Sequence, residues 1–141
     1  MKSPKRTTDM KAVHIPLMLR RGYDALTFFG VIVTRTKDEA EKINSRYDTL
    51  KNHEMIHLYQ ARATRNSWIC FYCCYAYYWL QGLFCARKVK NAGYRLNPFE
   101  MEAYRHMNDL HYLDNKQTAN EWQLFAAMTA KERAKFMGAN G

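Results

Sequence analysis

The stretch that most limits how this chain can fold is residues 68–86, which contain no Asp, Glu, Lys or Arg. A helix that is apolar on every side has to be covered by other protein or by lipid. The stretch is long enough to cross a bilayer, but its tyrosines and its Gln81-Gly82 pair are unusual near a bilayer centre. We therefore expect a buried central helix. Contact with a membrane surface or a protein partner through residues 68–86 is the alternative.

Cysteine usage and the N-terminal sequence bear on the compartment. All four cysteines lie in this same stretch, at Cys70, Cys73, Cys74 and Cys85. They lack the dispersed spacing of a disulfide framework, which indicates a reducing compartment, and we expect them to pack as small apolar residues. The apolar run 12–19 is short and contains His14 and Pro16, so it is not a convincing secretory signal. We expect a cytoplasmic protein, with peripheral membrane association as an open alternative.

The size and charge of the chain favour one basic domain. With 141 residues, 48% of them hydrophobic, the sequence predicts a single core. We interpret residues 1–11 as a flexible basic leader and residues 12–141 as the domain. The net charge of +9 favours anionic partners such as a membrane surface or nucleic acid. Because the basic residues are scattered, a plain solvated surface is the simpler interpretation.

Two apolar runs near the N-terminus have the composition of strands, at 12–19 and 25–34. The interval between them, residues 20–24, has a length typical of an antiparallel hairpin. Helices are predicted after these runs; Asp48 or Thr49 suits the start of one helix, and Asn97-Pro98 suits the start of another. The expected helical ranges are 37–46, 49–65, 68–86, 99–113 and 118–136.

The helix expected after Asp48 contains the sequence His53-Glu54-Met55-Ile56-His57. Residues four positions apart lie on one helix face, so both imidazoles can reach the same metal ion. An H-E-x-x-H helix is typical of zinc metallopeptidases, in which the histidines bind Zn²⁺ and the glutamate is the general base. His53 and His57 are therefore predicted metal ligands, and Glu54 is a predicted catalytic residue.

A catalytic zinc needs a third protein ligand and keeps one position open. The long metzincin motif is excluded, because Gln60 and Ala63 occupy the positions of its glycine and histidine. A later helix offers Glu100 and Glu102 instead. Glu100 shares a face with the apolar Ala103, whereas Glu102 lies on the more polar side, so periodicity favours Glu100 as the ligand. Glu102 is the alternative.

These segments resemble a family of short, uncharacterised gluzincin-like proteins. Their pattern is H-E-x-x-H-x-x-Q, an aromatic helix, and then P-F-E-x-E-A-Y, which residues 50–60 and 97–104 match here. The E-x-x-A that begins at Glu100 also resembles the third-ligand motif of membrane heat-shock and prenyl-processing metallopeptidases. The resemblance implies Zn²⁺ as the cofactor, Glu100 as the third ligand and a peptide or protein substrate. It also implies a mostly helical, zincin-like domain of the α+β class, with a small N-terminal antiparallel β-hairpin or sheet packed on the H-E-x-x-H helix.

Further residues are candidates for roles around such a site. Tyr104 is the residue that we expect to stabilise a developing oxyanion, although packing in the core is its simpler role. The alternatives for the same role are Tyr94, His106 and His111. The candidates for orienting the ligand imidazoles are Asn52, Gln60 and Asp109.

The leading hypothesis from the sequence is a zinc-dependent metallopeptidase that hydrolyses peptide bonds with a zinc-activated water. One alternative is a catalytically silent binding protein with a zincin-like fold. The other is a basic protein associated with membrane or nucleic acid, in which the motif is incidental.

Overall fold

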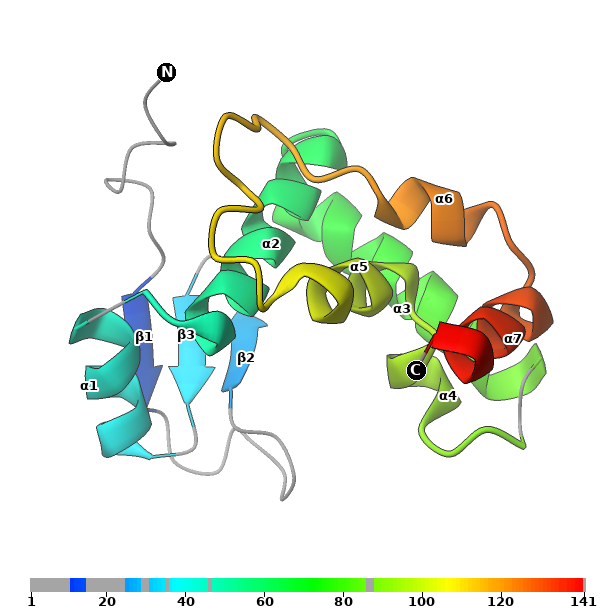
Figure 1. Ribbon diagram of the computed structural model, residues 1–141, viewed down its shortest axis with the longest axis horizontal. Coiled ribbons are helices and arrows are strands. Elements are labelled where there is room, and N and C mark those ends of the chain that lie inside the picture. The colour runs from blue at the N-terminus through cyan, green and yellow to red at the C-terminus, as the bar shows by residue number, and fades with distance from the viewer. Residues whose placement is uncertain are drawn as a thin grey trace.

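The structure is a computed structural model that describes residues 11–14, 25–28, 31–34, 36–45, 47–85 and 88–140. This part of the chain is mostly helical. A small sheet and α1 form one end of the molecule, the helices α3 to α7 form the other, and α2 lies between them (Figure 1). The helices are α1 (Lys37–Ser45), α2 (Thr49–Ala63), α3 (Trp68–Cys85), α4 (Ala92–Arg95), α5 (Pro98–His106), α6 (Trp122–Ala126) and α7 (Ala130–Asn140).

The sheet has three short strands, β1 (Lys11–His14), β2 (Ala25–Phe28) and β3 (Val31–Thr34), in the order β1-β3-β2. β3 pairs in parallel with β1 and antiparallel with β2. The predicted hairpin between 12–19 and 25–34 is therefore wrong. The second run contains two strands that pair with each other, and β3 rather than β2 takes the place beside β1. Residues 15–24, which include the expected connection, lie outside the described residues, as does the expected leader apart from Lys11.

Helix α1 covers the outer side of β1. The side-chain oxygen of Asn44 accepts a hydrogen bond from the amide of Ala12, and its nitrogen donates to the carbonyl of Ala12, both at 2.9 Å. Asn44 therefore satisfies backbone groups that a further strand would otherwise pair with. At the opposite edge of this sheet, β2 contacts α2.

Helix α2 is the central helix of the molecule. It begins as predicted, with the carboxylate of Asp48 accepting a hydrogen bond from the amide of Lys51 at 3.0 Å. Its residues 51–57 and 59–61 are all buried, including polar ones. Helices α3 and α5 and strand β2 pack around it.

The prediction of a buried central helix at 68–86 is wrong. Within α3 only Phe71 and Gly82 are buried, whereas Ile69 and Phe84 are 68% and 67% exposed. The reason is that α2, α4, α5 and α7 approach α3 from one side, and no described element covers the other. Within the described residues, no helix combines the length and the apolar character that a membrane crossing requires.

The close packing of α3 against α4 predicts a measurable cost for enlarging Gly82. A Cβ atom on Gly82 would lie 2.7 Å from the carbonyl oxygen of Ala92, which is backbone and cannot swing away. We expect Gly82→Ala to lower the free energy of unfolding by about 1–3 kcal/mol in urea denaturation. Gly138→Ala is the matched control, because nothing lies within 4 Å of that position. Equal losses in the two variants would contradict this contact.

Helix α5 begins as predicted, with the side chain of Asn97 accepting from the amide of Phe99 and Pro98 in the first turn. The expected single helix at 118–136 is wrong, because residues 127–129 separate α6 from α7. Thr129 and Glu132 form a reciprocal capping box there: the hydroxyl accepts from the amide of Glu132, and the carboxylate accepts from the amide of Thr129. This box starts a new helix.

Candidate metal centre

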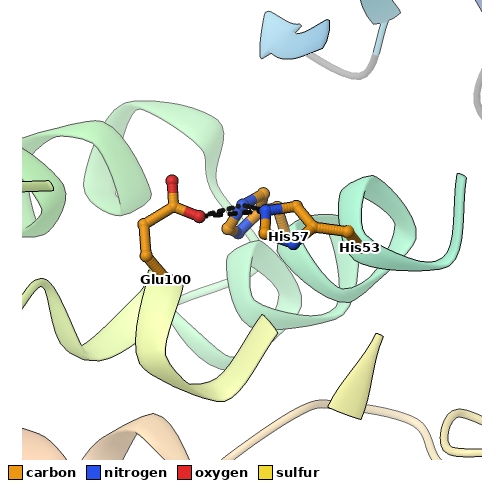
Figure 2. A group of neighbouring side chains, drawn as sticks. All are labelled: His53, His57 and Glu100. Atoms are coloured by element: carbon orange, nitrogen blue, oxygen red, sulfur yellow. Dashed lines mark hydrogen bonds and ion pairs between the residues drawn. The ribbon is translucent and has the colours of Figure 1, made fainter. Parts of the chain in front are cut away.

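Three side chains that can hold a metal ion converge between α2 and α5 (Figure 2). His53 Nε2 and His57 Nε2 lie 3.2 Å apart, and Glu100 Oε1 lies 3.0 Å from each of them. All three residues are at least 95% buried. The two imidazoles come from successive turns of α2, and the carboxylate comes from the first turn of α5.

Two amide side chains hold α5 in register with α2. Gln60 Nε2 donates to the carbonyl of Phe99 at 2.9 Å, and Asn52 Nδ2 donates to the carbonyl of Met107 at 2.9 Å. The bonded groups therefore lie on either side of Glu100 along α5. Both amides bond backbone carbonyls, so they fix the position of the α5 backbone, and with it that of Glu100, whatever the neighbouring side chains are.

Gln60 also determines the tautomer of His57, that is, which ring nitrogen carries the proton when the ring is neutral. Gln60 Nε2 donates to the Glu102 carboxylate as well as to Phe99, so Gln60 Oε1 is the acceptor atom. Oε1 lies 2.8 Å from His57 Nδ1, which must carry the proton. In the neutral ring, Nε2 then has the free lone pair that a metal requires. His53 Nδ1 is buried without a comparable partner among the described residues.

Glu102 supports this arrangement from behind. It is fully buried and accepts hydrogen bonds from the Tyr112 hydroxyl at 2.6 Å, from Gln60 at 2.9 Å and from the amide of Trp122 at 3.3 Å. The prediction that Glu102 lies on the wetter side of its helix is wrong, because α6 and the segment before it cover that side. Glu102 therefore orients Gln60 and does not take part in the three-residue group.

Tyr75 orients Glu100, a role that the sequence interpretation missed. Its hydroxyl donates to Glu100 Oε2 at 2.8 Å, which leaves Oε1 directed at the imidazoles. Burial and the charge of Glu100 raise the pKa of Tyr75 well above its usual value, so it remains a proton donor. One signal was available in the sequence: a tyrosine on the inward face of an apolar helix needs a hydrogen-bond partner.

The charges of the cluster shift the pKa values of its members in opposite directions. Burial alone would lower the pKa of His57, but the adjacent carboxylate of Glu100 raises it to about 9. Burial would raise the pKa of Glu100, but His57 and the hydrogen bonds from both imidazoles hold it well below its usual value. Three lone pairs thus meet at one point, and without a metal a proton on His57 is the compensating charge.

This pKa predicts an unusual pH dependence for the metal-free protein. Folding raises the pKa of His57 from 6.5 to about 9, so the protonated ring stabilises the folded state. This contribution to the unfolding free energy has its full value below pH 6.5 and is lost as the pH rises through 9. We expect chelator-treated protein to lose on the order of 3 kcal/mol of unfolding free energy between pH 6.5 and pH 9.5 in urea denaturation. Glu100→Gln should remove most of this slope. A wild-type protein equally stable at both pH values would contradict it.

Glu54 and Tyr104, the two predicted catalytic residues, both lie near the cluster. Glu54 is 4% exposed, and its charge contributes to the raised pKa of His57 and of Tyr94. The Tyr104 ring packs edge-on against the His53 ring, with centroids 4.5 Å apart. Its hydroxyl shares a hydrogen bond with the Tyr94 hydroxyl at 2.6 Å, and the residue is 49% exposed. Tyr104 therefore stands between the buried imidazole and solvent.

Other residues that the sequence suggested have partners elsewhere. His106 pairs with Glu121 and stacks on Tyr112, and His111 pairs with Asp114. The Asp109 carboxylate accepts from the amide of His111 at 3.1 Å. Asn52 bonds backbone carbonyls rather than an imidazole. All four cysteines are free thiols, and Cys73 and Cys85 are exposed, so the expectation that they are packed in the core holds only in part.

A pocket of about 380 Å³ opens beside the cluster, at the side of α5. Its walls are formed by α4, α5 and the end of α7, through Arg95, Glu100, Met101, Tyr104, Arg105, Phe136 and Met137. A molecule in this pocket therefore contacts two residues that belong to or cover the candidate metal centre.

No protein-family model, curated protein or solved structure matches this chain, so a function has to be inferred from the arrangement of these side chains.

Proposed function

We propose that this chain is a zinc-dependent metallopeptidase of the gluzincin type, with His53, His57 and Glu100 as the ligands of Zn²⁺. The observation that carries the proposal is the convergence of two imidazole nitrogens and one carboxylate oxygen, all buried, within 3.2 Å of one another.

The donor set and its spacing fit zinc. Ligand atoms that bind one tetrahedral zinc at about 2.0–2.1 Å lie roughly 3.3 Å apart, close to the 3.0–3.2 Å separations here. Two histidines and one glutamate leave one coordination position open, as catalytic sites do and closed structural sites do not. When bound, zinc supplies Lewis acidity for the attack of water on a carbonyl carbon.

The residues of the chain supply the remaining parts of a hydrolytic site. Glu54 follows His53 on α2, and its buried carboxylate is the group that we expect to accept the proton of the attacking water and pass it to the leaving amine. Tyr104, at the border between His53 and solvent, is the hydroxyl that we expect to donate a hydrogen bond to the carbonyl oxygen. Tyr75 and Gln60 hold the ligands in orientation.

A peptide is the substrate class that best suits the surroundings. Among the described strands, β2 lies at an edge of the sheet and contacts the motif helix α2, so an extended peptide can add to it by main-chain hydrogen bonds. The pocket beside Glu100 offers apolar walls and two arginines for side chains of such a peptide. A small sheet beside an H-E-x-x-H helix also supports our proposal of a zincin-like α+β architecture.

The test is hydrolysis of a mixed peptide library by purified protein, followed by mass spectrometry. The proposal predicts cleavage that a chelator abolishes and that added Zn²⁺ restores. A protein that contains one zinc per chain and cleaves no peptide would instead be a catalytically silent zinc protein, and the peptidase proposal would then fail.

A further inference from the structure

The outward side of α3 is an exposed apolar stripe, made up of Ile69, Cys73, Tyr77, Leu80 and Phe84. These residues recur every three or four positions, so they lie on one face of the helix. Ile69, Tyr77, Leu80 and Phe84 are 68%, 62%, 46% and 67% exposed, and Cys73 is exposed as well. A continuous apolar stripe of this kind, roughly 22 Å long, is uncommon on a monomer surface unless something binds it.

The stripe is not needed for the core or for the metal centre. The inward side of α3 serves both, since Phe71 is 2% exposed beside the His57 ring and Tyr75 bonds Glu100. Substitutions in the stripe can therefore be made without touching the residues that hold the fold or the ligands together.

Both ends of the stripe are basic. Arg65 is exposed in the turn before α3, and Lys88 and Lys90 are exposed after it. No Asp or Glu occurs in the sequence between Glu54 and Glu100. The stripe thus combines exposed apolar side chains with positive charge at either end and no acidic residue from its own part of the chain.

This charge pattern argues against a second copy as the occupant. An antiparallel pair of α3 helices would bring Arg65 of one copy to Lys88 and Lys90 of the other, and a parallel pair would bring like ends together. Either arrangement places positive against positive, and two chains of net charge +9 repel one another as a whole.

We propose that this stripe docks on an anionic lipid surface, with α3 lying parallel to the membrane plane. Apolar and aromatic side chains such as Tyr77 and Phe84 enter the boundary between headgroups and acyl chains, while the flanking lysines contact anionic headgroups. Basic residues at both ends suit a helix that lies flat. The proposal concerns the face of α3 opposite to the metal centre, so it holds whether or not the peptidase proposal does.

Vesicle co-sedimentation of the purified full chain tests the docking. We expect binding to phosphatidylcholine vesicles that contain phosphatidylserine, little binding to phosphatidylcholine alone, and weakening at high salt. Leu80→Asp should weaken binding at least about tenfold, because a charge replaces a side chain that enters the lipid. Lys88→Ala and Lys90→Ala should each weaken it about fivefold.

Leu110→Asp is the matched control, since Leu110 is 39% exposed but lies outside α3. It should bind vesicles as the wild type does, and all variants should unfold at the wild-type temperature. The proposal is overturned if the wild type does not bind phosphatidylserine vesicles, or if Leu110→Asp weakens binding as much as Leu80→Asp. It is also overturned if size-exclusion chromatography shows a dimer that Leu80→Asp dissociates while vesicle binding is absent.

Discussion

Replacing Glu54 with glutamine is expected to lower the rate of peptide hydrolysis by about a hundredfold to ten-thousandfold while zinc binding is retained. Glutamine keeps the size and the hydrogen-bonding capacity of the buried side chain but cannot accept a proton from water. Because Glu54 is not one of the three converging ligands, the metal affinity should change little. The comparison is kcat/KM against the best library peptide, with zinc content measured on the same preparations.

A suitable control for Glu54→Gln is Glu41→Gln, the same chemical change at an exposed position on α1. It should leave both hydrolysis and zinc content unchanged. If Glu54→Gln hydrolyses peptides at the wild-type rate, another group is the base and the role given to Glu54 is wrong. If it loses zinc, Glu54 is needed to form the metal site itself.

Replacing Glu100 with glutamine is expected to weaken zinc binding by at least about a hundredfold. The neutral amide lacks the charge that pairs with the buried imidazoles, and one of the three proposed protein ligands is lost. Competition with a chromogenic chelator measures the affinity. The loss should appear without large unfolding, since Gln60 and Asn52 still join α5 to α2 through the backbone.

Glu102→Gln is the matched comparison, because it changes a second buried glutamate on the same helix. Its carboxylate accepts from Gln60 and from backbone amides, so the expected effects are a less stable fold and a metal affinity lowered by about tenfold to a hundredfold. If Glu100→Gln retained zinc and Glu102→Gln lost it, the third ligand would be Glu102, and the assignment of Glu100 would be wrong.

The parts of the structure that the sequence predicted are those that depend on near neighbours. The starts of α2 and α5 are confirmed, because an Asp or Asn cap acts on amides two or three residues away. The helical period correctly directs Glu100 toward α2, because every residue on that side of α5 follows the same 3.6-residue repeat. His53 and His57 lie together for the same reason.

The errors concern contacts between segments that are distant in the sequence. Glu102 appears polar and solvated from its own helix, but Tyr112 and the start of α6 cover it. β1 pairs with β3 rather than with β2, which is nearer in the sequence, because strand pairing depends on contacts across the whole sheet. The exposure of α3 was equally invisible, since an uncharged helix has the same sequence pattern whether protein or another surface covers it.

The break between α6 and α7 is a different kind of error, because its cause is local. Thr129 and Glu132 have the spacing of a capping box, and that spacing can be seen in the sequence. Thr129 interrupts the apolar stripe of Trp122, Phe125, Ala126 and Phe136, so the sequence also shows the break in that stripe, although the periodicity on either side predicts one helix.

The most direct measurement is the metal content of protein purified without added metal, by elemental analysis of the wild type and of His53→Ala. The expected result is close to one zinc per chain in the wild type and almost none in His53→Ala. A folded wild type that contains no zinc and takes up none from solution would contradict the proposal, as would a His53→Ala protein that retains its zinc.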